Sequence, residues 1–244
     1  MSLLRVETII YFASCKREGC RTSTHQRGAL YNYTIHDPPL THHGIEQCKA
    51  LRQSLEKRFS SEQGDMAIIA SPMRRTIQTA QLALPWLLEK GVKIEADADW
   101  QENSAKPCDT GSSATLIQSE FPGVDFSTVD SVWPDKTSPA GRPYAYTRES
   151  ILARGQRGLA KLYNRPEKLV FVISHSGFLR LGVVGWWFFN SDYRIFQLSL
   201  GPLGVAVEQD ESTLTGGLGL SWETRVELGF ELPEEDPVVE GGPA

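Results

Sequence analysis

The stretch Leu169-Val-Phe-Val-Ile-Ser-His-Ser-Gly-Phe178 decides the fold. It begins with an apolar, β-branched run without alternation, which is typical of a strand buried on both faces of a parallel sheet. His175 follows this run directly, and open α/β sheets bind their ligands at the carboxyl ends of the strands. A histidine in this position can hold a phosphoryl oxygen, donate a proton or act as a nucleophile. A structural histidine packed in the turn is the alternative.

Two further apolar runs, residues 7–13 and 66–70, have the same pattern and predict two more buried strands. Apolar residues recur at helical spacing in residues 43–59, 72–89 and 148–163. Because strands alternate with helices, the sequence predicts an α/β fold. The expected architecture is a three-layer αβα sandwich with a mainly parallel sheet.

The chain is expected to form one domain over residues 1–232. Residues 102–147 are rich in Ser, Pro, Thr, Asp and Gly. We expect an irregular insertion there, with one or two short helices, that acts as a lid. Two β-like runs follow at residues 193–200 and 203–208, and a third strand candidate lies at 218–228. The acidic tail, residues 233–244, is expected to be disordered.

The charge balance argues against several classes of partner. The 244 residues hold 25 Lys and Arg against 30 Asp and Glu, a net charge of −5, so no basic excess is present to neutralise a nucleic-acid backbone. A local basic pocket for one small anion remains compatible with this balance. The most apolar stretch, residues 182–189, is far shorter than the roughly 20 residues that span a bilayer. We therefore expect a cytoplasmic protein without membrane or nucleic-acid partners, with its cysteines reduced.

The motif Ser71-Pro-Met-Arg-Arg-Thr-Ile-Gln-Thr-Ala80 follows a predicted strand and opens a predicted helix. Ser71 is expected to cap this helix, and Pro72 suits its first turn. Arg75 then stands at a helix N-terminus just past a strand, where an anion binds favourably. The alternative is that Arg74 and Arg75 form a solvated surface pair.

Two further motifs lie before the insertion or at its start. Trp100-Gln-Glu-Asn103 places the carboxylate of Glu102 at the start of the insertion, where a solvated glutamate is the alternative. Asp37-Pro-Pro-Leu-Thr-His-His-Gly-Ile-Glu-Gln47 forms a turn that leads into a helix, with Thr41 as its expected N-cap.

Taken together, these motifs resemble the histidine phosphatase superfamily, the phosphoglycerate mutase-like proteins, over most of residues 5–185. Asp37-Pro-Pro-Leu-Thr-x-x-Gly-x-x-Gln47 is similar to the strand-to-helix signature of that family. Ser71-Pro-x-x-Arg75-x-x-Gln-Thr-Ala80 is similar to its second-arginine motif, and Val172-Ile-Ser-His175-x-Gly-Phe-Leu to its second-histidine motif. Glu102 falls where the family has its proton donor. The Asp37-Pro-Pro and Pro107-Cys-Asp-Thr-Gly-Ser112 variants look most similar to fungal members.

The resemblance implies a phosphatase-type hydrolase that acts on a small phosphorylated metabolite, a phosphomonoester, in two steps. In the family a histidine attacks phosphorus, and water then releases phosphate from the phosphohistidine. By the same resemblance Arg75, His175 and Ser176 bind the phosphoryl oxygens, and Glu102 protonates the leaving oxygen. Fixed donors stabilise the charge on these oxygens. No metal and no organic cofactor is therefore expected.

The nucleophile motif of the family, Arg-His-Gly or Arg-His-Ala after the first strand, is not intact. Without a gap, Ser14 and Cys15 occupy its positions, while Thr24-His25-Gln-Arg-Gly contains its residues in another order. Three explanations compete: an error in the gene sequence, a pseudoenzyme that kept the anion pocket, and a working enzyme that uses His25 or Cys15. A thiolate at Cys15 is chemically conceivable beside Lys16 and Arg17. A mutase, an isomerase, or a member recruited to a biosynthetic pathway is a further alternative.

Two other patterns have competing interpretations. Cys15, Cys20 and His25 suggest a partial zinc site, but their spacing fits the common ligand patterns poorly, and an exposed loop is the alternative. The aromatic run at 186–189 either lines a pocket for an apolar substrate or belongs to the core or an interface. The sequence leaves the substrate and the oligomeric state open.

Overall fold

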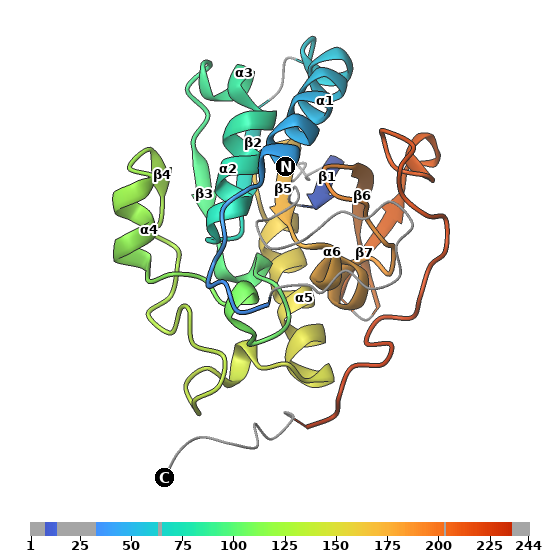
Figure 1. Cartoon of the computed structure of the whole chain (residues 1–244). Coiled ribbons are helices and arrows are strands. Elements are labelled where there is room, and N and C mark those ends of the chain that lie inside the picture. The colour runs from blue at the N-terminus through green and yellow to red at the C-terminus, as the bar shows by residue number, and fades with distance from the viewer. Residues whose placement is uncertain (1–7, 14–32, 63–64, 203, 236–244) are drawn as a thin grey trace, which may run out of the picture.

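A seven-stranded sheet in the order β4-β3-β2-β5-β1-β6-β7 forms the centre of the computed structural model (Figure 1). The structure describes residues 8–13, 33–62, 65–202 and 204–235. The strands from β4 to β1 run parallel, and β6 and β7 continue the sheet antiparallel. The strands are β1 Thr8–Ala13, β2 Met66–Ala70, β3 Ile94–Ala96, β4 Val124–Asp125, β5 Leu169–Ser174, β6 Tyr193–Gly201 and β7 Gly204–Gln209.

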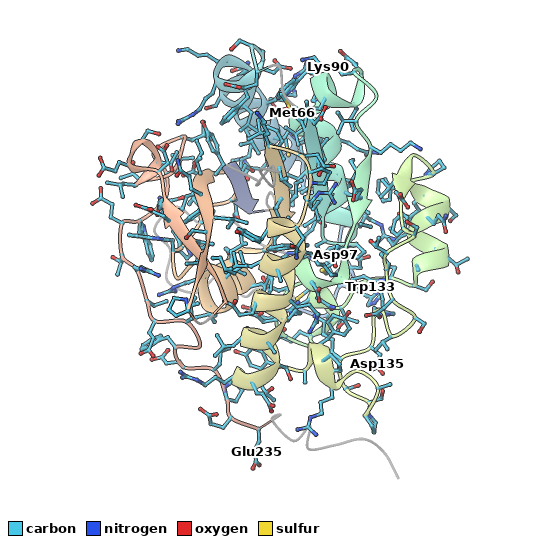
Figure 2. All side chains as sticks on the ribbon, turned by 180° about the vertical axis from the view of Figure 1, so that it is seen from behind. Met66, Lys90, Asp97, Trp133, Asp135 and Glu235 are labelled. Carbon is cyan, nitrogen blue, oxygen red and sulfur yellow. The ribbon has the colours of Figure 1, made fainter. Side chains whose placement is uncertain are left out.

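Helices cover both faces of this sheet, so the predicted three-layer sandwich is confirmed. α1, α2 and α3 pack on one face, while α5 and α6 pack on the other, where α5 crosses in front of the strands in Figure 2. No helix in the described ranges combines the length and the apolar composition that crossing a membrane requires. The helices are α1 His42–Phe59, α2 Arg74–Ala83, α3 Pro85–Leu88, α4 Ala114–Glu120, α5 Arg148–Tyr163 and α6 Ser176–Phe178, with 3₁₀ turns η1 Ala98–Trp100, η2 Pro107–Asp109, η3 Arg142–Tyr144 and η5 Glu211–Thr213 and a π-helical turn η4 Leu179–Val183.

The central strand β5 shows why its sequence is apolar without alternation. Phe171 and Ile173 face the core beneath α1 and α2, whereas Val170 and Val172 face the core beneath α5. Successive side chains of a strand point to opposite faces. Because helices cover both faces, all four side chains are fully buried.

The carboxyl ends of β1, β2 and β5 meet at one edge of the sheet. Ala13, the last residue of β1, pairs with Ser174, and Ala70, the last residue of β2, pairs with Ile173. The backbone N–H of Ser71 then donates to the carbonyl oxygen of Ile173 at 2.9 Å. The residues that follow β2 and β5 therefore leave the sheet side by side.

The predicted insertion, residues 102–147, extends beyond this edge. Figure 2 places Met66, the first residue of β2, near the top, and Asp97, which follows β3, in the middle. Trp133 and Asp135 of the insertion lie below Asp97, in the direction in which the parallel strands point. The insertion also adds the short strand β4 to the outer edge of the sheet, which the sequence did not predict.

The predicted helices at 43–59 and 148–163 are confirmed as α1 and α5, and the side chain of Thr41 caps α1 by accepting from the N–H of Gly44 at 2.9 Å. The single helix predicted over 72–89 is wrong, because the structure divides this stretch into α2 and α3. The break falls at Pro85, which has no N–H to continue a helix. Pro72 precedes α2 and does not lie in its first turn.

The C-terminal part of the chain contains two of the three predicted strands. β6 and β7 match the runs at 193–200 and 203–208. The strand candidate at 218–228 is wrong, because this segment is irregular apart from one isolated bridge between Arg225 and Trp186.

Gly155 marks the tightest approach of α5 to the π-helical turn η4. A Cβ atom on Gly155 would lie 1.9 Å from the carbonyl oxygen of Gly182. We predict that Gly155→Ala lowers the free energy of unfolding by about 1–3 kcal/mol, because an added methyl group overpacks a close backbone contact. Gly123→Ala is the matched control, since a Cβ on Gly123 meets nothing within 4 Å. Equal denaturant midpoints for the two variants would contradict the prediction.

Candidate functional site

His175 stands directly after β5 and is buried. Its Nδ1 lies 2.9 Å from Nη2 of Arg75, and its Nε2 lies 2.9 Å from the hydroxyl of Ser71. A guanidinium group can only donate hydrogen bonds. Nδ1 of His175 therefore holds a lone pair, and the ring proton is on Nε2, which donates to Ser71 Oγ.

This tautomer restricts the chemistry of the pair formed by His175 and Ser71. A base that activates a serine must direct a lone pair at the hydroxyl group. Here the nitrogen that faces Ser71 carries the proton, so the pair is not an activated serine nucleophile. His175 instead offers a hydrogen-bond donor at the edge of the sheet, the kind of group that stabilises charge on an oxygen.

The N-terminus of α2 is capped by Asp37, and the prediction that Ser71 caps it is wrong. α2 begins at Arg74, after Met73, which makes no capping bond with its side chain. The buried carboxylate of Asp37 accepts from the N–H of Arg74 at 3.1 Å and from the N–H of Ser112 at 2.9 Å. A negative charge at a helix N-terminus is favourable. Asp37 thereby ties the arginine-bearing helix to the insertion.

Arg75 is buried, so the interpretation of the two arginines as a solvated pair is wrong for this residue. Its Nη1 donates to the carbonyl oxygen of Cys108 at 2.8 Å, and its Nη2 lies 3.5 Å from a carboxylate oxygen of Asp109. Arg74 is partly exposed and forms a bidentate pair with Glu120 at 2.7 Å. The insertion therefore holds the guanidinium group of Arg75 beside His175.

Glu102 lies against the turn that follows His175. A Cβ atom on Gly177 would come within 2.7 Å of Oε1 of Glu102, so the carboxylate packs on the backbone of α6. The same Oε1 accepts from the N–H of Asn103 at 2.9 Å. Ser176 stands between His175 and Gly177 and is half-buried. The structure thus brings His175, Arg75, Glu102 and Ser176 to one edge of the sheet.

Two buried cations hold the backbone on either side of Glu102. Nζ of Lys136 donates to the carbonyl oxygen of Glu102 at 2.7 Å. Arg154 of α5 donates to the carbonyl oxygen of Gln101 at 2.7 Å and to Oδ1 of Asn103 at 3.0 Å. The position of the Glu102 carboxylate therefore depends on both cations.

Sequence reasoning missed these two cations. Arg154 lies three residues after Ile151, on the apolar face of α5, and this spacing was the one available signal. Lys136 lies in an irregular segment, where no periodicity marks a residue as buried.

Burial changes the acid–base properties of both cations. The pKa of Lys136 is lowered to about 7, chiefly by burial and then by the positive charges of Arg154 and Arg75, against the opposing effect of Asp109 and Glu102. Burial likewise lowers the pKa of Arg154 to about 10. The cost of desolvating a charge outweighs its local ion pairs in both cases.

The nucleophile candidates Cys15 and His25 lie outside the described residues, as does Cys20 of the suggested zinc site. Cys48 and Cys108, which the structure does describe, are both buried. Within the described ranges, no group of three or more His, Cys, Asp or Glu side chains is arranged to hold a metal ion.

The aromatic run at 186–189 is divided between two environments. Phe188 belongs to the core beneath α5, and Trp186 packs against that core. The ring of Trp187 instead stacks on Trp222, with 4.3 Å between the ring centres, and Trp222 is exposed. The core interpretation is therefore confirmed for Phe188.

The model of the histidine phosphatase superfamily (branch 1) matches residues 23–206, which is more than half of the 244 residues. The chain belongs to this superfamily. The match includes His25 and begins after Cys15.

Individual relatives agree with this assignment. Phosphoglycerate mutase-like protein 1 of Arabidopsis thaliana is 28% identical over 177 residues, covering 62% of this chain and 61% of the relative. A second Arabidopsis phosphoglycerate mutase-like protein is 28% identical over 169 residues, 59% of this chain and 61% of its own. The chain thus spans about three fifths of the length of these relatives. The crystal structure of the ecdysone phosphate phosphatase of Bombyx mori with tungstate has the same fold, with 16% identity, a TM-score of 0.51 and coverage of 84% and 92% of the two chains.

The lowered pKa of Lys136 predicts a pH-dependent contribution to stability. Between pH 7 and the usual lysine pKa near 10.5 the unfolded chain binds the proton and the folded chain releases it, so stability rises with pH. We expect the difference in unfolding free energy between the wild type and Lys136→Met to increase from pH 6 to pH 9. Above pH 7 this increase is on the order of 1 kcal/mol per pH unit. Lys106→Met removes an exposed lysine and serves as the control. A difference that stays constant over this range would contradict the prediction.

Proposed function

We propose that the chain hydrolyses a small phosphomonoester at the edge of the sheet where His175 lies. The buried contact between Arg75 and His175 carries the proposal. It holds a guanidinium group and an Nε2–H donor together where β2 and β5 end. Donors that are fixed before the substrate arrives stabilise the charge that develops on phosphoryl oxygens. Membership of the histidine phosphatase superfamily supports the same substrate class.

In this mechanism the phosphoryl group takes the place of Ser71 as the acceptor for His175 Nε2–H. Arg75 contributes a planar, permanently charged donor, and Ser176 is a further donor by resemblance to the superfamily. The charge of Arg75 and the hydrogen-bond donors of His175 and Ser176 stabilise the non-bridging oxygens, so the proposal requires no metal or organic cofactor.

Glu102 is the proposed proton donor. As the nucleophile forms its bond to phosphorus, the bond from phosphorus to the ester oxygen breaks, and Glu102 protonates the departing oxygen. In the second step Glu102 takes a proton from water, the water oxygen bonds to phosphorus, and the bond to the nucleophile breaks. The proximity of the Glu102 carboxylate to the turn after His175 supports this role.

His25 is the proposed nucleophile, in preference to Cys15. The superfamily match begins at residue 23 and therefore includes Thr24-His25-Gln-Arg-Gly, which contains the histidine, arginine and glycine of the family motif in altered order. An imidazole nitrogen would then carry the phosphoryl group, as in the superfamily.

A pseudoenzyme that binds phosphate without turnover is the second candidate. One observation favours it: no contiguous Arg-His-Gly or Arg-His-Ala occurs in the sequence. This candidate predicts that vanadate, a phosphate analogue, binds at the same edge while no substrate is hydrolysed. Steady phosphate release by the pure protein would exclude it.

Removal of the His175 side chain tests the proposed phosphatase activity. We expect the purified protein to release phosphate from an aryl phosphate, and His175→Ala to lower kcat/KM by about 100- to 1,000-fold, because it removes a donor to the transition state. His43→Ala removes an exposed histidine and should retain activity. Wild-type turnover by His175→Ala, with its fold confirmed by circular dichroism, would contradict the proposal.

A further inference from the structure

Lys136 closes the loop formed by residues 102–109, which carries Glu102 at its start and Asp109 at its end. Lys136 is buried, with only 3% of the residue exposed. Nζ donates to the carbonyl oxygens of Glu102 at 2.7 Å, Ser104 at 2.9 Å and Asp109 at 2.7 Å. Two of these carbonyls belong to the start of the loop and one to its end. A single ammonium group thus uses its three N–H bonds to join both ends.

Each end of this loop also contacts the site. At the start, the carboxylate of Glu102 packs on the backbone of Gly177, next to His175 and Ser176. At the end, the carbonyl oxygen of Asp109 accepts from Lys136. The carboxylate of the same residue lies 3.5 Å from Nη2 of Arg75. Lys136 therefore contacts the backbone of the proposed proton donor directly and is linked to the proposed phosphoryl-binding arginine through Asp109.

The segment that presents Lys136 is itself anchored. The ring of Trp133 lies against Gly111, where a Cβ atom would come within 2.1 Å of it, and its Nε1–H donates to the carbonyl oxygen of Ser112 at 2.9 Å. The carboxylate of Asp135 accepts from the N–H groups of Thr137 at 2.9 Å and Ser138 at 3.0 Å. Figure 2 shows Trp133 and Asp135 on this part of the insertion. Lys136 thus reaches the loop from a segment fixed on both sides.

We propose that Lys136 is a positioning residue that holds the carboxylate of Glu102 at the catalytic edge of the sheet. This inference rests on the proposed phosphatase function for its kinetic consequences, but its structural part stands on the three carbonyl contacts. Lys136 touches neither substrate nor reacting atoms and acts through the backbone of the loop.

The three carbonyl groups around Nζ explain why a lysine occupies this place, because the neighbouring cations by themselves disfavour its charge. Arg154 and Arg75 face it as cations, and Asp109 and Glu102 face it as anions. A neutral apolar side chain of similar length would remove this donor from three buried or partly buried carbonyl groups, which is costly. The loop would then relax toward other donors or water, and Glu102 would move with it.

The kinetic test is a double-mutant cycle that combines Lys136→Met with Glu102→Gln. We expect Lys136→Met to lower kcat by roughly 10- to 100-fold with little change in KM, because a small displacement of a catalytic group has effects of this size. In the Glu102→Gln background the same substitution should cost less than about twofold, since Glu102 is the residue through which it acts. Lys106→Met, an exposed lysine of the same loop, should retain wild-type kcat. Equal losses in both backgrounds would overturn the proposal.

Hydrogen exchange tests the structural part without any turnover. We expect Lys136→Met to accelerate amide exchange in residues 103–109 at least tenfold while α1 and β5 keep their protection. Lys136→Gln, which retains two N–H donors, should have an intermediate effect. Unchanged exchange in residues 103–109, or protection lost throughout the chain in both variants, would overturn the proposal. A wild type that hydrolyses no phosphate would instead refute the proposed function, and the exchange result would still decide the role of Lys136.

Discussion

The hydrogen bond from the Arg75 guanidinium group to Nδ1 of His175 is the interaction on which the rest of the site depends. It fixes the histidine tautomer, and it requires that a permanently charged group be buried. A buried cation is stable only when its donors are satisfied. Cys108 and Asp109 meet this requirement for Arg75, and both belong to the insertion. The insertion is therefore needed to hold the arginine as well as to carry Glu102.

Other polar groups in and around the insertion also form hydrogen bonds that hold the site in place. Asp109 is held by Ser104 and by Lys136, and Arg154 holds the backbone on the other side of Glu102. Asp37 fixes the start of α2 to Ser112. Apart from the side-chain contact between Ser104 and Asp109, each of these bonds joins a buried side chain to backbone atoms of a distant segment. The edge of the sheet thus carries a polar network in which the proposed donors have fixed positions.

The sequence predicted those features that depend on local pattern. The apolar runs of β2 and β5 and the periodicity of α1 and α5 follow from burial on two faces or on one face, so they were predicted correctly. The motifs also identified His175, Arg75 and Glu102, which the structure brings to one edge. The cap of α2 could not be predicted, because Asp37 is separated from Arg74 by 37 residues. Lys136 was missed for the same reason: its burial depends on carbonyl groups far away in the chain.

The contact between Arg75 and His175 is tested by the two-bond ¹H–¹⁵N correlation spectrum of the His175 ring, assigned by comparison with His175→Ala. The contact requires a ring that is protonated on Nε2 and bare on Nδ1, because the guanidinium group of Arg75 can only donate to Nδ1. A ring protonated on Nδ1 would contradict it, since the contact between Arg75 and His175 could not then exist, and the proposed donor for the phosphoryl oxygens would be lost.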